Sequence, residues 1–328
     1  MKHTALLVLF LVNTCWLLAQ SVYTKEVEDQ ISQFENNLSG RVKIKGKETY
    51  NIADRMAFYH AKGLSIAVVH DYKVVWAKGY GWADVKTRKR VTPETLFEPG
   101  SISKSLNAVG ILKLVQDKRL DLDTDINSYL TSWKFPYDTV AHGKKITLAQ
   151  LLSHSAGLTV HGFPGYDLTD SIPTVPQILD GVSPANTPPV RSAFEPGIKF
   201  QYSGGGTTIS QLILTDVTKQ PYDEYMYENV LKPMGMVNSF YTQPAPDDRR
   251  ALCATGYYPN GRQVPHQFHA YPEQAAAGLW MTPTDLCQYI IETQKAYSGQ
   301  SAKVLNQEMT KLRLTPFNDA SSALGVFI

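Results

Sequence analysis

The sequence predicts an α/β (α+β) fold in which an antiparallel sheet, flanked by helices, adjoins a mostly helical, loop-rich region. The first of three observations is a pair of apolar strand patterns over 64–69 and 73–81, separated by a turn-like dipeptide. The second is a helix over 102–116 that is apolar on nearly every side and must therefore be buried. The third is the stretch 131–200, whose proline, glycine and histidine content indicates long loops, and such loops commonly carry function.

The remaining elements follow from helix and strand signals. Thr282 is a helix cap, Pro283 suits the first helical position, and Asp285 puts an acid in the first turn, so we expect a helix from there to about residue 297. The last residues, 324–328, have an apolar strand pattern. Further helices are expected over 24–38, 51–60, 148–153, 208–218 and 222–231.

Composition excludes several classes of protein. Of the 328 residues, 43% are apolar and 19% are charged, so a sizeable core can form and wholesale disorder is excluded. The formal net charge of +2 gives no electrostatic basis for binding nucleic acid or an anionic membrane surface. The sequence has no phosphate-loop, dinucleotide or zinc-protease motif, and His266 and His269 lack an acidic partner at metal spacing. We therefore expect no cofactor and no metal.

The first twenty residues have the pattern of a secretory signal. Met1-Lys2-His3 is short and basic, residues 5–12 are an unbroken apolar run, and Ala19 offers a small residue for cleavage. We therefore expect a signal peptide over 1–20 and one domain over 21–328 in a secreted or periplasmic protein. No membrane span is expected once the signal is removed, and an uncleaved anchor is the alternative.

Three cysteines are too few for a disulfide scaffold. Cleavage of the signal would also remove Cys15, leaving Cys253 and Cys287. In an oxidising compartment these two could pair, and two buried free thiols are the alternative.

The clearest chemical pattern is Ser101-Ile102-Ser103-Lys104 at the start of the buried helix. One helical turn places residues three apart on the same face, so the Ser101 hydroxyl and the Lys104 amine should be neighbours. A serine hydroxyl is a weak nucleophile until a base takes its proton. A solvated lysine is a poor base, because a neutral amine at pH 7 costs roughly 4–5 kcal/mol, and burial lowers that cost. Backbone N–H groups at the helix start could stabilise an oxyanion.

A helix cap followed by a surface lysine is the alternative for this motif. The context favours catalysis, because Phe97-Glu98-Pro99-Gly100 leads into the motif and the helix is buried. The stretch 97–130 resembles the active-serine region of the serine β-lactamase and penicillin-binding protein superfamily, and is most similar to its class C β-lactamase-like branch. Further similar stretches are Leu151–Leu158, Phe194–Gly197 with Phe200–Ser203, Leu231–Met236 and Ala276–Pro283.

The resemblance implies a β-lactamase/transpeptidase-like fold. It implies that Ser101 is the acylated nucleophile, Lys104 its base, and Tyr202 a proton relay to the leaving group or the deacylating water. Ser203 and Gly204, in a glycine-rich turn before the next helix, would adjoin the substrate. His154 is expected to make a structural hydrogen bond.

The sequence departs from the family pattern in two places. The family motif is commonly Tyr-x-Asn, whereas Tyr202-Ser203-Gly204 lacks the amide that would contact the substrate, which weighs against β-lactam hydrolysis more than against acyl transfer. The third motif, Lys-x-Gly or His-x-Gly on a strand, is missing. In the family it lies downstream of a segment similar to 323–328. We therefore expect a chain that is incomplete at its C-terminal end, without the last strands of the sheet.

These observations predict an exported serine hydrolase that works through an acyl-enzyme on Ser101. Its expected substrates are small molecules or peptides with an ester or amide bond, namely β-lactams, D-amino-acid peptides or carboxylic esters. The alternatives are a non-catalytic penicillin- or peptide-binding module and a degenerate truncated homologue.

Overall fold

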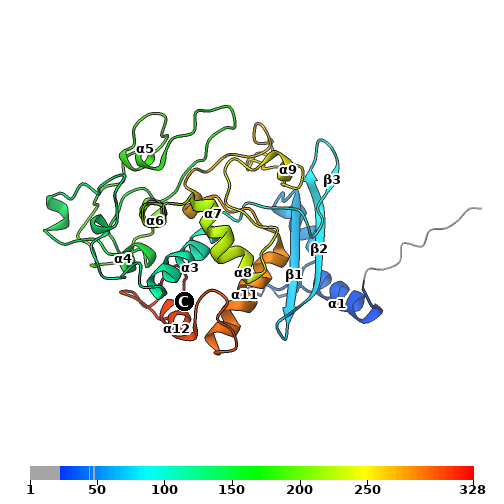
Figure 1. Ribbon diagram of the computed structural model, residues 1–328. Helices are drawn as coiled ribbons and strands as arrows, with labels where there is room; N and C mark the ends of the chain where they lie inside the picture. The colour runs from blue at the N-terminus through cyan, green and yellow to red at the C-terminus, as the bar shows by residue number, and fades with distance from the viewer. Residues whose placement is uncertain (1–22, 44, 47–48) are drawn as a thin grey trace, which may run out of the picture. The chain divides into compact units, whose positions relative to one another are not determined.

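The computed structural model describes the chain from residue 23 onward, except for three positions (Figure 1). The described ranges are 23–43, 45–46 and 49–328, so the predicted signal segment over 1–20 lies outside them. The chain divides into two compact units, residues 1–55 and residues 56–328.

The described part of the first unit contains helix α1 (Lys25–Asn36), which confirms the helix predicted over 24–38. The helix begins after Thr24, whose hydroxyl accepts a hydrogen bond from the Val27 N–H at 3.4 Å. After the helix, an isolated antiparallel β-bridge pairs Leu38 with Tyr50.

The second unit contains a three-stranded antiparallel sheet formed by β1 (Gly63–His70), β2 (Lys73–Asp84) and β3 (Lys89–Arg90). In the turn between β1 and β2, Asp71 and Tyr72 have φ angles of 49° and 59°. Two left-handed residues give a turn the same twist as the strands on either side, so the predicted hairpin forms. The sheet packs against α11, and that helix (Pro283–Tyr297) starts at Thr282 as predicted.

Helix α3 (Ile102–Gln116) is buried along almost its whole length, as its apolar pattern predicted. Ten of its fifteen residues are buried. It contacts α6 (Gly204–Thr218) and α12 (Gln307–Arg313) (Figure 1). It also contacts α10 (Gln274–Ala277). A helix that is close-packed on several sides cannot rotate without disturbing each interface, so the first turn of α3 is held in a fixed orientation.

A buried polar network also fixes α3. The Asn107 side-chain amide in α3 donates to Ser210 Oγ of α6 at 2.9 Å and accepts from the Tyr222 hydroxyl at 3.1 Å. Tyr222 is the first residue of α7 (Tyr222–Met226). Because each hydrogen bond has a defined direction, the network specifies how the three helices register against one another.

The other helices are shorter, and those predicted over 51–60, 148–153 and 222–231 are confirmed. No helix in the described ranges has the length and apolar character needed to cross a membrane. The shorter elements are α2 (Ile52–Phe58), η1 (Ile126–Ser128), η2 (Thr139–Ala141), α4 (Leu148–Leu152), α5 (Val175–Asp180), the π-helical η3 (Tyr227–Leu231), α8 (Lys232–Met234) and α9 (Asp247–Arg250).

Two helices differ from the prediction. Helix α6 begins at Gly204 rather than at residue 208, so the glycine-rich turn expected before it is wrong. The Ser203 hydroxyl caps the helix by accepting from the Gly206 N–H at 2.9 Å, which draws the glycines into the first turn. Helix α5 lies in the stretch predicted to be mostly loop, and a capping box of Thr174 and Gln177 starts it.

The strand expected over 324–328 is also wrong. Ser322 and Phe327 form an isolated bridge, and the Ala323 N–H donates to the Val326 carbonyl oxygen at 2.9 Å, which makes a tight turn instead. The turn packs closely on α3. A Cβ atom at Gly325, where φ is 81°, would lie 2.2 Å from the Ala108 Cβ.

Cys253 and Cys287 are buried free thiols, which decides between the two alternatives for this pair. Burial, with the nearby Glu98 carboxyl as a second cause, raises the pKa of the Cys253 thiol to about 12. The reactive thiolate is therefore strongly disfavoured at neutral pH.

Replacing Leu112 by alanine should lower the free energy of unfolding by about 2–5 kcal/mol, because a cavity in a close-packed core refills poorly. This side chain is 0% exposed. Leu312→Ala is the matched control, since Leu312 is 43% exposed and its truncation should cost less than about 1 kcal/mol. Urea unfolding followed by circular dichroism measures both, and equal losses would contradict the core position of α3.

Candidate active site

Ser101 stands at the start of α3, where the backbone bends into the helix. Gly100 has φ 55°, a left-handed conformation that favours glycine, and it turns the chain from Pro99 toward the helix axis. Ser101 occupies the N-cap position, but its hydroxyl accepts no capping hydrogen bond. Within the described part of the chain its backbone N–H has no acceptor either. The backbone N–H is therefore available to a ligand, and the hydroxyl is not used to cap the helix.

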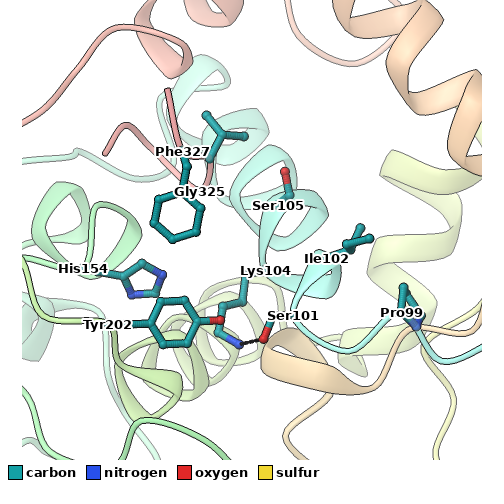
Figure 2. Close-up of a pocket in the computed structure, with 10 residues that line it drawn as sticks. Pro99, Ser101, Ile102, Lys104, Ser105, His154, Tyr202, Gly325 and Phe327 are labelled. Carbon is teal, nitrogen blue, oxygen red and sulfur yellow. Dashed lines mark hydrogen bonds between the residues drawn. The ribbon is translucent and has the colours of Figure 1, made fainter. Parts of the chain in front are cut away.

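Lys104 lies one helical turn further on, and its amine reaches the Ser101 hydroxyl (Figure 2). Nζ is 3.1 Å from Ser101 Oγ and donates to the Ala276 carbonyl oxygen at 2.7 Å. The residue is only 7% exposed, which is not the arrangement of a helix cap followed by a surface lysine. Burial lowers the pKa of the Lys104 amine to about 8, because the charged form loses its hydration.

The Tyr202 phenol is directed at the same pair (Figure 2). Its ring centroid is 5.0 Å from Lys104 Nζ. Burial raises the pKa of the phenol, and a hydrogen bond with Ser101 acts in the opposite direction. The ring lies 4.3 Å from the His154 ring and is stacked 6.4 Å from the Phe327 ring, between centroids. These two neighbours hold the phenol over Ser101.

His154 has the structural role expected of it. Its Nδ1 accepts a hydrogen bond from the Ser203 N–H at 3.2 Å. Burial, together with the nearby Lys104 charge, lowers the pKa of the imidazole to about 4. His154 is therefore neutral at physiological pH and adds no positive charge beside Lys104.

Ser203 and Gly204 are buried behind the site instead of lining it. The Ser203 hydroxyl is used to cap α6 and to donate to a backbone carbonyl oxygen at 3.0 Å. A Cβ atom at Gly204 would lie 2.9 Å from the Phe163 ring and 3.2 Å from the His161 carbonyl oxygen. The space that an amide side chain at position 204 would need is therefore filled by protein.

Two cavities meet at Ser101 and Lys104. The larger cavity has a volume of about 470 Å³ and is mostly apolar; besides the two shared residues, its lining includes Pro99, Ile102, His154, Tyr202, Val326 and Phe327. The smaller cavity has a volume of about 310 Å³ and is lined further by Glu98, Gly162, Phe163, Tyr271 and Ala277. Ser101 and Lys104 therefore face both cavities.

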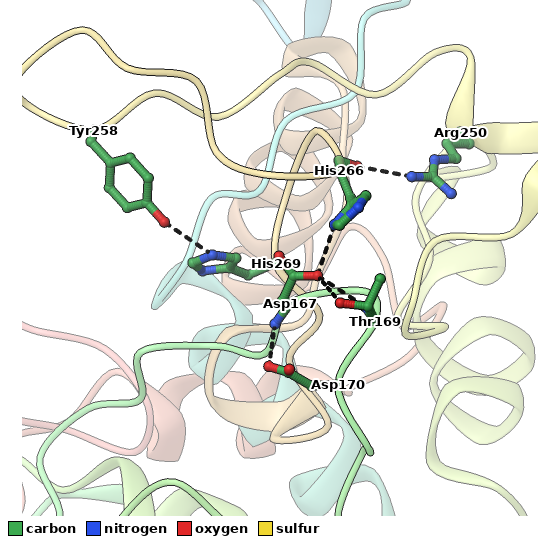
Figure 3. Close-up of polar contacts among 7 residues, drawn as sticks. All are labelled: Asp167, Thr169, Asp170, Arg250, Tyr258, His266 and His269. Atoms are coloured by element: carbon green, nitrogen blue, oxygen red, sulfur yellow. Dashed lines mark hydrogen bonds and ion pairs between the residues drawn. The ribbon is translucent and has the colours of Figure 1, made fainter.

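The loop that contributes to the smaller cavity is anchored by polar contacts (Figure 3). Asp167 Oδ1 is 2.8 Å from His266 Nδ1, and His269 Nδ1 is 3.1 Å from the Pro164 carbonyl oxygen. These contacts tie the loop to the segment around residues 266–270, and they keep this wall of the cavity in place.

Glu98, Tyr271 and Phe327 are among the cavity residues that the sequence analysis did not assign to the site. Glu98 carries a sequence signal, because a charged residue so close to a buried helix is unusual. Tyr271 and Phe327 carry none, since they come from distant parts of the chain and only folding brings them to Ser101.

Comparison with known proteins agrees with the motifs. The sequence profile of the family described as Beta-lactamase matches residues 50–326. The protein flp of Staphylococcus aureus (strain MRSA252) is 32% identical to this chain over 186 residues, which are 56% of this chain and 36% of flp. The chain therefore spans little more than a third of the length of that relative. The superfamily resemblance is confirmed.

Two solved structures share the fold. The octameric penicillin-binding protein homologue from Pyrococcus abyssi matches with a TM-score of 0.60 and 25% identity, over 80% of this chain and 58% of that one. The Beta-lactamase/D-alanine carboxypeptidase from Pseudomonas syringae matches with a TM-score of 0.60 and 23% identity, over 80% of this chain and 67% of that one. The predicted β-lactamase/transpeptidase-like fold is thereby confirmed.

The buried amine predicts a pH profile. The rate at which an uncharged fluorophosphonate labels Ser101 should rise about tenfold per pH unit below pH 8 and level off above it. The reason is that only the neutral Lys104 amine, whose pKa is about 8, can accept the Ser101 proton. Initial labelling rates from about pH 6 to about pH 10 measure the profile.

The control separates Lys104 from Glu98, because burial raises the pKa of the Glu98 carboxyl to about 8 as well. The Glu98→Gln variant should keep the same inflection. A flat profile in the unaltered protein, or an inflection that disappears with Glu98, would contradict the assignment to Lys104.

Proposed function

The chain belongs to the Beta-lactamase family, and from that premise we propose that it is a serine hydrolase that forms an acyl-enzyme on Ser101. The observation that carries the proposal is the 3.1 Å contact between the Ser101 hydroxyl oxygen and the buried Lys104 amine. With its pKa lowered to about 8, this amine is neutral in about one molecule in ten at pH 7. A solvated lysine would be neutral in far fewer.

In the acylation step, Lys104 Nζ takes the proton from Ser101 Oγ while Oγ bonds to the substrate carbonyl carbon. The negative charge that develops on the carbonyl oxygen is stabilised by the Ser101 N–H at the positive end of α3. When the carbonyl reforms, the bond to the leaving group breaks. The proton held by Lys104 then reaches the leaving group, with the Tyr202 phenol as relay.

Deacylation runs the same proton path in reverse. Water attacks the acyl carbon, its proton passes through Tyr202 or Lys104, and Ser101 Oγ leaves as a restored hydroxyl. The contacts of Tyr202 with the His154 and Phe327 rings support this role, because a relay must stay aligned through both steps.

The substrates we propose are small molecules or peptides with an ester or amide bond: β-lactams, D-amino-acid peptides or carboxylic esters. The two cavities support a substrate with substituents on both sides of the scissile bond. The signal-like pattern of residues 1–20 supports export to a secreted or periplasmic location.

A non-catalytic penicillin- or peptide-binding module is the second candidate. It is favoured by Gly204, where the family amide is absent and the Phe163 ring fills the space. Without that contact a bound acyl group would be held less firmly for attack by water.

Replacing Ser101 by alanine should abolish covalent labelling by a fluorophosphonate and by a fluorescent penicillin, because the nucleophile is removed. Ser103→Ala is the matched control within the same motif and should still be labelled, since Ser103 Oγ is engaged with the Gly100 carbonyl oxygen at 2.6 Å. Gel fluorescence measures labelling. Labelling that decays supports a hydrolase, labelling that persists supports the binding module, and a folded protein that neither reagent labels contradicts both.

Replacing Lys104 by alanine should slow Ser101 labelling by about 100-fold or more, the usual contribution of a positioned base. Lys113→Ala is the control, because Lys113 lies on the same helix but pairs with Asp117 at 2.5 Å, and its rate should match that of the unaltered protein. Stopped-flow labelling measures the rates. An unchanged rate in the Lys104 variant would remove this residue from the mechanism.

A further inference from the structure

Positive charge is concentrated in the turn between β2 and β3. Residues 86–90 contain four exposed cations: Lys86, Arg88, Lys89 and Arg90. None of the four forms an ion pair within the described ranges. The acid at the end of β2, Asp84, instead accepts hydrogen bonds from Thr87 Oγ1 at 2.8 Å and Thr255 Oγ1 at 2.7 Å. The formal net charge of the whole chain is only +2, so these four cations exceed it.

Helix α9 lies beside β3 and adds to this charge (Figure 1). The Lys89 amine of β3 donates to the carbonyl oxygen of Ala251, the residue that follows α9. Arg249 and Arg250 form the last turn of the helix. The positive charges of Lys89, Arg249 and Arg250 all act on one buried thiol, that of Cys253, so the three cations lie around the same point. Two acids begin the same helix: Asp247 and Asp248. The cations of the two segments thus outnumber the acids.

Exposed apolar side chains lie among these cations. Val85 directly precedes the basic run and is 41% exposed, and Leu252 follows α9 and is 40% exposed. The backbone at both positions is held, because the Val85 N–H donates to the Tyr257 hydroxyl at 2.8 Å and the Leu252 carbonyl oxygen accepts from the Leu96 N–H at 2.9 Å. Apolar side chains surrounded by lysine and arginine are typical of surfaces that lie in the interface of a membrane.

An aromatic groove continues this surface. It has a volume of about 420 Å³, and its lining includes Lys62, Trp82 and Tyr258. The Arg90 guanidinium lies 3.8 Å from the centroid of the Trp82 ring, and the Arg262 guanidinium lies 5.0 Å from that of Tyr258. Tryptophan and tyrosine are enriched at the level of lipid headgroups, where one part of the ring system is apolar and the other is wet.

We propose that this basic face docks the protein on a membrane surface that contains anionic phospholipid. The face comprises residues 85–90, Arg249, Arg250 and Leu252, together with the groove. Its cations contact headgroup phosphates, and Val85 and Leu252 enter the interface. The proposal is independent of the hydrolase activity. The net charge of the chain does not indicate this partner, because folding brings cations from separate segments together.

Two observations favour a membrane over a nucleic acid as the partner. The signal-like pattern of residues 1–20 predicts export, and lipid headgroups are an anionic surface that an exported protein meets. The exposed Val85 and Leu252 side chains gain nothing from a phosphate backbone, whereas a lipid interface removes them from water.

The first test measures sedimentation of the full chain with two kinds of vesicle, phosphatidylcholine alone and equal parts of phosphatidylcholine and phosphatidylglycerol. We expect a partition coefficient at least about tenfold larger on the anionic vesicles, and a difference that shrinks as salt is added. Because residues 5–12 are an unbroken apolar run, they would bind both kinds of vesicle and leave the ratio to the charged groups. Equal partitioning on the two would overturn the proposal.

Charge reversal locates the effect on the face. Lys86→Glu combined with Arg88→Glu should lower partitioning on the anionic vesicles by about tenfold or more. Lys118→Glu combined with Lys303→Glu is the matched control, since both of these lysines are exposed and the net charge changes equally. Lys118 also shares the left-handed backbone of Arg88, with φ 57° against 55°. The control should partition like the unaltered protein, and a loss as large as in the first variant would overturn the proposal.

An apolar substitution separates a membrane from other polyanions. Leu252→Ser should lower partitioning on the anionic vesicles severalfold, whereas Leu312→Ser, at an equally exposed leucine outside the face, should not. An unchanged value for Leu252→Ser, together with binding of a DNA duplex as tight as that of the vesicles, would overturn the membrane in favour of a nucleic acid. Circular dichroism checks that each variant folds, and if one does not, the vesicle ratio of the unaltered protein decides.

Discussion

The burial of one lysine amine beside one serine hydroxyl is the constraint around which this molecule is organised. Lys104 is buried because α3 is packed along several sides, by α6, α10, α12 and the turn at residues 322–327. A charged amine in such a place is disfavoured, and the two oxygen atoms it contacts are a hydroxyl and a carbonyl, neither of which carries a charge. The packing of the helix therefore determines the basicity of the amine beside Ser101.

Burial in these apolar surroundings also shifts the pKa values of the titratable groups near Lys104. It lowers the pKa of His154 to about 4, raises that of Glu98 to about 8 and raises that of the Tyr202 phenol. These groups are therefore largely uncharged at neutral pH in the free protein. Electrostatic interactions are strong in such surroundings, so a single charge on a ligand shifts several of these equilibria at once.

The site also shows how a family pattern can change without disturbing the fold. Gly204 lacks the amide found at this place in the family motif, and the Phe163 ring occupies the space that a side chain would need. That ring belongs to a loop held by the Asp167–His266 contact, and it becomes a wall of the smaller cavity. The absent amide at position 204 therefore coincides with an apolar surface next to Ser101.

The sequence by itself determined the elements whose signals are local. The β1–β2 hairpin, the buried α3, the capped start of α11 and the adjacency of Ser101 and Lys104 all depend on residues within a few positions of one another. It misjudged the start of α6 and the last residues, because a serine cap and contacts with α3 outweighed the local patterns there. Only the tertiary structure decided what surrounds the serine. The Ala276 carbonyl on the amine, the Phe327 ring on Tyr202, and the meeting of Glu98 with Tyr271 join residues that are far apart in the chain. Such contacts depend on packing and on the burial of charge between distant segments. They produce no hydrophobic periodicity in the sequence from which they could be predicted.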